Sequence, residues 1–264
     1  MVVSQLDVLG IQMIVLPDRD SAEYCAADLY NLIEGDRVYF LHDSGKNLER
    51  SNYKSSLGVQ RTSAIGKILE YREGEQMIVV TYPSALEEII PEKGKISGSL
   101  LKLVVGEERS YEEIKEILFS SGFERVDFVS EPGQFAVRGA LIDIFSYSFN
   151  NPFRISFFGD EIESINIFDA NTQLSKEKVD YVDIYPDLSS SEDGEGSMVT
   201  DILPEDTLVW LDSSDMYKDK SFFPELKKFR NIYMELPLSR QDEDAVRFNI
   251  SPQPTFNKNF NLLL

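Results

Sequence analysis

Short, largely apolar runs alternate with segments of helical pattern in the first third of the chain. Three such runs are Met13–Leu16, Val38–Leu41 and Met77–Thr81. Strands that are apolar on both faces are typical of a parallel sheet covered by helices on both sides. Between the first two runs, apolar residues spaced three and four apart from Ala22 to Ile33 predict a helix that ends at Gly35. The alternation therefore predicts an α/β domain built on a parallel sheet.

The character of the sequence changes after the polar, turn-rich stretch Pro91–Lys95, where we place a domain boundary. Ser110 and Glu113 form a capping-box pattern that predicts the start of a helix. Gly159-Asp160 is a two-residue hairpin signal between two runs of period-two pattern. The strands expected in this part are Leu100–Val105, Gln134–Val137, Leu141–Phe145, Phe153–Phe158, Glu161–Phe168 and Tyr181–Tyr185. One helix with an antiparallel sheet indicates a smaller α+β domain.

We therefore expect four parts along the chain. Residues 1–96 form the first part of the α/β domain, and residues 97–187 form the α+β domain. Residues 188–215 comprise a polar, mobile linker and a strand that returns to the first sheet, so that the α+β domain is inserted in the α/β domain. Residues 216–264 begin a third small domain that is incomplete, and we interpret the chain as part of a longer polypeptide.

The charge balance bears on possible partners. The chain has 26 Lys and Arg against 46 Asp and Glu, a formal net charge of −20, which opposes autonomous binding to a phosphate backbone. One cysteine, Cys25, and one histidine, His42, do not supply the usual zinc ligand sets, so no metal is expected. No run of apolar residues reaches the length of a membrane span, and nothing at the start is typical of a signal peptide. These features favour a cytoplasmic protein without a membrane partner.

The motifs of nucleotide and hydrolase chemistry are missing from the sequence. Ser44-Gly45-Lys46 follows a strand, but the phosphate loop requires a glycine at position 40, where Phe40 stands, and Ser or Thr at position 47, where Asn47 stands. The carboxylates Asp160, Glu161 and Glu163 are better explained as a solvated hairpin tip than as an acid–base pair. We expect no catalytic residues and no cofactor.

Three consecutive motifs carry a resemblance to a known family. They are 131–145 (EPGQFAVRGALIDIF), 152–165 (PFRISFFGDEIESI) and 168–175 (FDANTQLS). Together they resemble the UvrB-like N-terminal region of bacterial transcription-repair coupling factors, the Mfd family. Weaker similarity extends over nearly the whole chain.

The resemblance implies a degenerate helicase-like α/β domain that carries an inserted UvrA-binding domain similar to domain 2 of UvrB. It implies a non-catalytic interaction module that recruits UvrA, the nucleotide excision repair protein, to a stalled RNA polymerase. The translocase of such a factor lies elsewhere in the full-length protein. Two alternatives are a UvrB-type DNA-dependent ATPase and an autoinhibitory module that binds other domains of its own full-length chain.

Strand alternation suggests which residues would bind UvrA. In Phe153–Phe158 the pattern places Arg154 and Phe158 on the face opposite the apolar set, and continued from Gln134–Val137 the same alternation does so for Arg138. Arginine and aromatic side chains are favoured at interface hot spots. The resemblance assigns UvrA contacts to Arg138, Arg154 and Phe158. The alternative is that both arginines pair with local acids such as Asp143 and that Phe158 packs under the hairpin turn.

Overall fold

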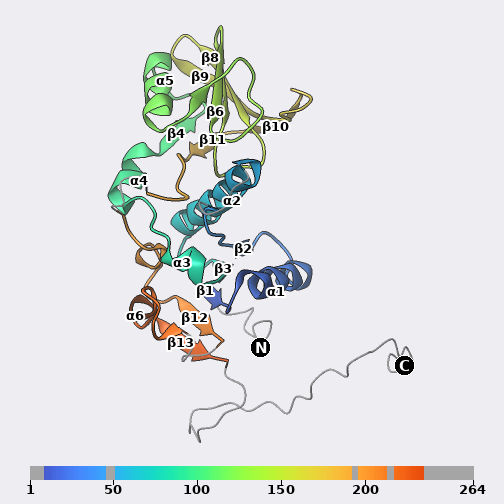
Figure 1. Cartoon of the computed structure of the whole chain (residues 1–264). Coiled ribbons are helices and arrows are strands. Elements are labelled where there is room, and N and C mark those ends of the chain that lie inside the picture. The colour runs from blue at the N-terminus through green and yellow to red at the C-terminus, as the bar shows by residue number, and fades with distance from the viewer. Residues whose placement is uncertain (1–8, 46–50, 192–195, 213–216, 235–264) are drawn as a thin grey trace, which may run out of the picture. The chain divides into compact units, whose positions relative to one another are not determined.

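A computed structural model describes residues 9–45, 51–191, 196–212 and 217–234. Its first sheet has the order β13-β12-β1-β3-β2, and all of its strand pairs are parallel (Figure 1). The strands are β1 (Gly10–Val15), β2 (Val38–Phe40), β3 (Gln76–Thr81), β12 (Leu208–Leu211) and β13 (Arg230–Tyr233). Every residue of β1 is buried, as its apolar sequence predicts. The α/β class with a parallel sheet is confirmed.

Helices and loops cover both faces of this sheet, and each face has its own apolar cluster. One cluster joins Ile14, Ile78 and Trp210 to α1, and the other joins Met13, Val79 and Val209 to α2 and the segment around Leu188. The helices that the structure describes in the whole chain are α1 (Arg19–Leu32), α2 (Ser51–Glu70), α3 (Pro83–Glu87), α4 (Lys93–Ser99), α5 (Tyr111–Ser120) and α6 (Phe223–Leu226). A short 3-10 helix spans Val199–Asp201.

The helix ends follow local chemistry. Asp18 is the N-cap of α1, and its carboxylate accepts from the Ser21 amide at 2.8 Å. Ser110 caps α5 and accepts from the Glu113 amide, as the sequence predicts. α4 includes part of the stretch that we expected to be a turn, and its Ile96 is buried in the core of the parallel sheet.

The second sheet has the order β10-β9-β8-β7-β6-β5 and is antiparallel except at the β5–β6 pair. Its strands are β5 (Glu124–Arg125), β6 (Gln134–Arg138), β7 (Leu141–Phe145), β8 (Phe153–Phe158), β9 (Glu161–Phe168) and β10 (Ser175–Val179). A separate antiparallel pair joins β4 (Leu101–Val104) to β11 (Tyr181–Ile184). At the β8–β9 hairpin Gly159 has φ +65°, a conformation that glycine adopts without steric cost. One face of the second sheet packs with α5, β4 and β11 into a core of its own.

The chain leaves the parallel sheet after β3 and returns to it at β12, because both strands pair with β1. The returning segment differs from the mobile linker that we expected. Leu188 and Ser189 are buried, and the amide of Ser197 donates to the Ile90 carbonyl at 2.9 Å. Residues 192–195 of that expected linker lie outside the described residues.

The sequence analysis assigns residues 216–264 to the start of a third domain, and the structure differs in part of this range. Residues 230–233 form β13, whose pairing with β12 extends the parallel sheet by one strand. Phe222 and Leu226 are fully buried in the same core. The apolar pattern of this segment therefore belongs to the parallel sheet, and residues 235–264 lie outside the described residues.

We predict that Leu101–Pro186, expressed alone, folds. Its core lies entirely within this range, from Leu101 to Ile184, and includes α5. Dispersed amide resonances in a heteronuclear NMR spectrum are the expected result. A spectrum with the narrow dispersion of an unfolded chain would show that this core depends on the parallel sheet.

Candidate functional site

The second sheet has one face on its core and another face that carries polar and charged side chains. Alternation along β6, β7 and β8 places Arg138, Asp143 and Arg154 on this second face. A small apolar cluster, comprising Val129, Ala136, Phe145 and Phe168, covers part of the same face. We call the surface around these three charged residues the arginine face.

Asp143 lies at the centre of the arginine face and is only 1% exposed. It is paired with Arg154 in the β7–β8 register, and the Arg154 guanidinium donates to its carboxylate through Nε at 2.7 Å and Nη2 at 2.9 Å. Nη2 of Arg138 donates to the same carboxylate. The hydrogen bonds between Arg154 and Asp143 raise the pKa of Arg154 above its usual value. One buried carboxylate thus holds two arginines that are both partly exposed.

Aromatic rings support the two guanidinium groups. The Arg138 group lies 4.8 Å from the ring centroid of Phe128, and the Arg154 group lies 4.4 Å from that of Phe168. Gln173 also accepts from Arg154 Nη2, at 3.4 Å. Two aromatic contacts and one buried carboxylate therefore restrict how each arginine is presented.

Phe158 lies at the end of β8 and is 78% exposed. It does not pack under the hairpin turn, because its neighbour Phe157 takes the core position. The arginines do pair locally with Asp143, as the alternative interpretation expected. The structure thus joins Arg138 and Arg154 through one acid, and alternation puts Phe158 on the same side further along β8.

Sequence reasoning did not single out three residues that surround this face: Phe128, Gln173 and Leu174. They lie in loops, where no strand or helix period indicates the direction of a side chain. Gln173 has φ +61°, which is uncommon for a residue other than glycine and marks a fixed turn.

Asp160, Glu161 and Glu163 at the hairpin tip are exposed, in agreement with a solvated tip.

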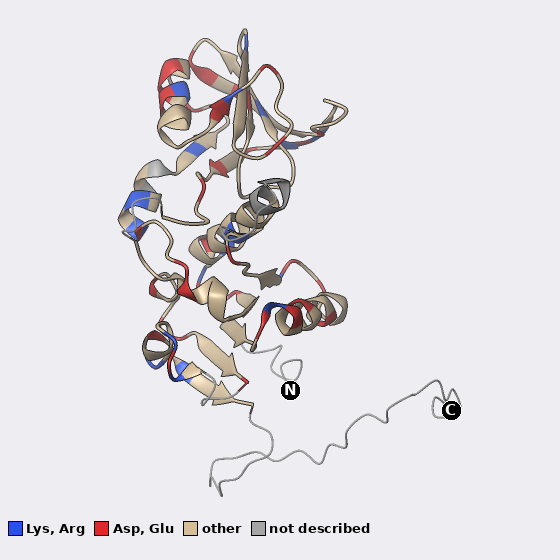
Figure 2. Cartoon of the chain, viewed as in Figure 1, with Lys and Arg blue, Asp and Glu red and all other residues tan. Residues whose placement is uncertain are grey.

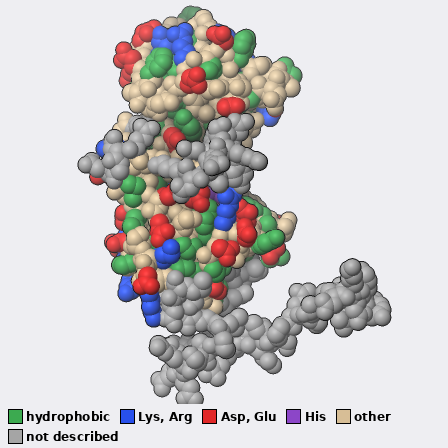
Figure 3. Space-filling view, viewed as in Figure 1, with side chains coloured by type: hydrophobic (Ala, Val, Ile, Leu, Met, Phe, Trp, Pro, Cys, Tyr) green, Lys and Arg blue, Asp and Glu red, His purple; other side chains and the backbone are tan. Residues whose placement is uncertain are grey.

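Charges of both signs are interspersed over the described chain. Figure 2 shows acidic residues along α1 and α5, with basic residues scattered among other elements. On the face seen in Figure 3, basic, acidic and apolar side chains are mixed over the part of the chain that carries β8 and β9. A partner that binds there would meet local groups and not a broad field of one sign.

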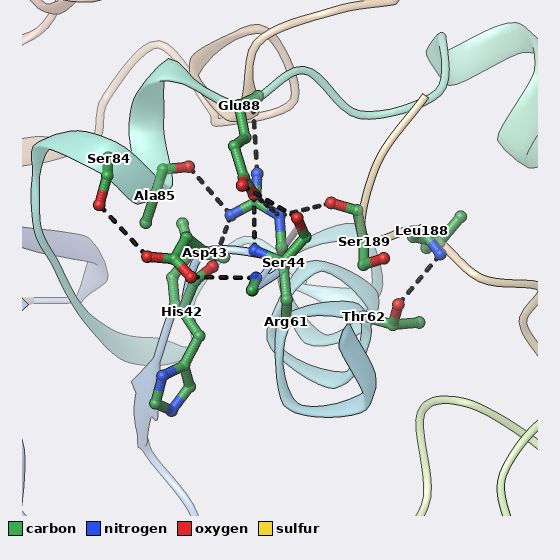
Figure 4. A network of polar contacts seen from close by, with 12 residues as sticks. His42, Asp43, Ser44, Arg61, Thr62, Ser84, Ala85, Glu88, Leu188 and Ser189 are labelled. Carbon is green, nitrogen blue, oxygen red and sulfur yellow. Dashed lines mark hydrogen bonds and ion pairs between the residues drawn. The ribbon is translucent and has the colours of Figure 1, made fainter. Parts of the chain in front are cut away.

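The loop after β2 contains Ser44 and Gly45, which the sequence analysis tested as part of a phosphate loop. Side chains of the chain itself accept hydrogen bonds from the backbone amides of this loop (Figure 4). Glu88 accepts from the Ser44 amide at 2.6 Å and from its hydroxyl at 2.9 Å. The Gly45 amide donates to Asp43 at 3.0 Å. These amides therefore do not face a phosphate group, and Lys46 lies outside the described residues.

Arg61 of α2 is fully buried beside this loop (Figure 4). Its guanidinium donates to the carbonyls of His42 at 2.6 Å, Ala85 at 2.9 Å, Ser189 at 2.8 Å and Glu88 at 3.1 Å. The Glu88 carboxylate lies 3.5 Å from Nε. Burial lowers the pKa of Arg61, and the carboxylate of Glu88 opposes this effect. The network joins the end of β2, α3 and the returning segment to α2.

Among the described residues, no helix is long and apolar enough to cross a membrane. No group of three or more His, Cys, Asp or Glu residues in this part of the chain could hold a metal ion.

Residues 101–189 match the UvrB interaction domain family. The match includes β4 to β11, α5 and the arginine face, so the arginine face lies in the part of the chain that is similar to this family.

The chain is also similar to known transcription-repair-coupling factors. It is 31% identical to that of Bacillus subtilis over 167 residues, which are 62% of this chain and 14% of that protein. It is 32% identical to that of Escherichia coli over 110 residues, which are 42% of this chain and 10% of that protein. The match to the Staphylococcus aureus protein is 42% identical over 84 residues, 32% of this chain and 7% of that protein. The chain therefore spans about one seventh or less of these relatives, and its resemblance to the UvrB-like N-terminal region of this family is confirmed.

We predict that Arg61→Met lowers the free energy of unfolding by about 3–5 kcal/mol, because the guanidinium no longer donates to the carbonyls of His42, Ala85, Glu88 and Ser189. Urea unfolding followed by far-UV circular dichroism measures this change. Arg72→Met, at an exposed arginine that follows α2, is the matched control and should change stability by less than about 0.5 kcal/mol. Equal stability of the two variants would contradict a structural role for Arg61.

We also predict a pH dependence of stability that comes from His42. Burial, and then the charge of Arg19, lower the pKa of His42 to about 4 from its usual 6.5. The unfolded chain binds this proton first, so the contribution of His42 is complete above pH 6.5 and is lost as the pH falls towards 4. The loss should be on the order of 1–3 kcal/mol. The free energy of unfolding of His42→Gln, measured against pH, should not show this loss. Parallel profiles of the free energy of unfolding for the two proteins would contradict the prediction.

Proposed function

We propose that this chain is the part of a transcription-repair coupling factor that binds UvrA and recruits it to a stalled RNA polymerase, without catalysing a reaction itself. The observation that carries the proposal is the Arg138–Asp143–Arg154 arrangement on the arginine face. The match of residues 101–189 to the UvrB interaction domain and the similarity to coupling factors support it.

The arrangement suits binding for a physical reason. A guanidinium has five N–H donors, and Asp143 takes one nitrogen of Arg138 and two of Arg154, which leaves donors on both arginines for a partner. Because the groups are held before binding, less side-chain entropy is lost on association. Phe158 adds an exposed aromatic ring that can bury apolar area.

We further propose that residues 97–187 form a UvrA-binding domain inserted in a degenerate helicase-like α/β domain. The pairing of β3 and β12 with the same strand supports the insertion. The occupied amides of Ser44 and Gly45 favour a role without nucleotide over a DNA-dependent ATPase.

We predict that Arg138→Ala and Arg154→Ala each weaken binding of purified UvrA by roughly 1–3 kcal/mol, because each removes charge-assisted hydrogen bonds. Phe158→Ala should also weaken binding, with less dependence on salt, because apolar burial is not screened. Titration calorimetry of the full chain at several salt concentrations measures both effects.

The controls separate binding from folding. Arg138→Ala is the cleaner arginine variant, since Arg154 still donates twice to the buried Asp143. Glu163→Ala, at an exposed hairpin position, should bind as the unmodified chain does. Unchanged affinity in folded variants at all three positions would refute the proposed site, and no binding by the unmodified chain would refute the proposed function.

A further inference from the structure

Two exposed apolar side chains flank the arginine face. Phe128, in the loop between β5 and β6, is 62% exposed, and Leu174, in the loop between β9 and β10, is 69% exposed. Phe128 is in contact with Arg138 through its ring, and Leu174 directly follows the residue that accepts from Arg154. Phe128 is therefore an exposed apolar neighbour of Arg138, and Leu174 is an exposed apolar residue next in sequence to Gln173, which binds Arg154.

Gln173 connects these loops. Its side-chain amide donates to the Ala170 carbonyl at 2.7 Å and to the Val129 carbonyl at 3.5 Å, next to Phe128 in sequence. Its Oε1 accepts from Arg154. One side chain thus links the loop of Phe128, the loop of Leu174 and an arginine.

The turn that presents Leu174 is also fixed by its backbone. The Gln173 amide donates to the Asp169 carbonyl at 2.7 Å, and the Asp169 amide donates to the Leu174 carbonyl at 2.9 Å. The Asp169 carboxylate accepts from the amides of Asn171 and Thr172. The bond from Thr172, and then the ammonium group of Lys176, lower the pKa of Asp169 to about 2. Exposed apolar groups on ordered loops lose little conformational freedom when a partner covers them.

The charges of the face indicate which group of a partner fits it. Two guanidinium groups and one buried carboxylate leave one net positive charge, in a chain whose formal net charge is −20. A single carboxylate balances this charge. A phosphate backbone would bring many charges that the rest of the chain repels, and it would gain little from Phe128 and Leu174.

We propose that the binding surface extends over Phe128 and Leu174, and that the partner places one carboxylate side chain on Arg138 and Arg154 and packs apolar side chains on both flanks. This inference rests on the proposed function, because it takes the same protein partner for the same face. Purified UvrA is the probe.

The test uses the full chain with Phe128→Ala, Leu174→Ala and the double variant. Each single change should weaken binding about 5- to 50-fold, with an unchanged slope of affinity against salt, because apolar contacts are lost. Arg138→Ala should weaken binding and reduce that slope. Tyr181→Ala, at a residue 59% exposed on β11, is the matched control and should bind normally. Thermal unfolding should be nearly unchanged in the Phe128, Leu174 and Tyr181 variants, since these side chains are exposed.

The outcomes distinguish the inference from the proposed function. Normal binding by the Phe128→Ala/Leu174→Ala double variant, together with loss in Arg138→Ala, would overturn the inference and leave the proposed function standing. No binding by the unmodified chain would overturn both. A labelled single-stranded oligonucleotide provides a further arm: binding that depends on Arg138 but not on Phe128 would show a phosphate site and would also overturn the inference.

Discussion

The buried guanidinium of Arg61 is the interaction on which the arrangement of the α/β part depends. It lies on α2 and donates to carbonyls at the end of β2, in and after α3 and in the returning segment at Ser189. These segments are far apart in sequence, and one side chain binds a carbonyl in each of them. Burying a carbonyl without a hydrogen-bond donor costs free energy. Arg61 supplies donors to the carbonyls of the loops that close the sheet. The neighbouring contacts of Thr62 with Asp187 and Leu188 extend the same junction along α2.

Asp143 on the second sheet is also a buried charge, but of the opposite sign. Arg61 is a buried cation among carbonyl oxygens, whereas Asp143 is a buried anion between two cations that reach the surface. A carboxylate in this position must be paired, and the pairing fixes where Arg138 and Arg154 are presented. The internal requirement of the fold therefore produces an ordered, positively charged surface. Binding and stability are coupled at this point, because a change at either arginine also alters the surroundings of the acid.

The sequence predicted those parts of the fold in which the local pattern and the tertiary structure agree. Largely apolar runs such as Met77–Thr81 favour burial, and the hydroxyl of Ser110 has a defined role at a helix start. β10 was missed because its residues, from Ser175 to Val179, are mostly exposed at the edge of the sheet and show no apolar period. The segment at Leu188 and Ser189 has a linker composition, yet its hydrogen-bond partners lie on α2, more than 100 residues earlier: Arg61 donates to the Ser189 carbonyl, and the Thr62 hydroxyl accepts from the Leu188 amide.

The candidate site shows the same limit. Alternation put Arg138, Arg154 and Phe158 on one side of the strands, and it already suggested Asp143 as a local partner. It could not indicate that one acid serves both arginines, because that depends on the register of three strands. Phe128 and Leu174 lie in loops, where no period indicates direction: the Phe128 ring contacts Arg138, and the backbone of Leu174 is held by the Asp169 amide.

The physical role of the acid also bears on how specificity can arise. A pair of free arginines would attract any anion, whereas a pair that shares a buried carboxylate retains one net charge and a fixed geometry. Because Phe128 and Leu174 are exposed and apolar, binding then depends on the side chains around a partner's carboxylate as much as on the charge of that carboxylate. Such a surface discriminates against polyanions through the repulsion of the rest of the chain and favours a protein surface that combines one acid with apolar side chains. This discrimination matters because phosphate groups would otherwise compete for the same arginines.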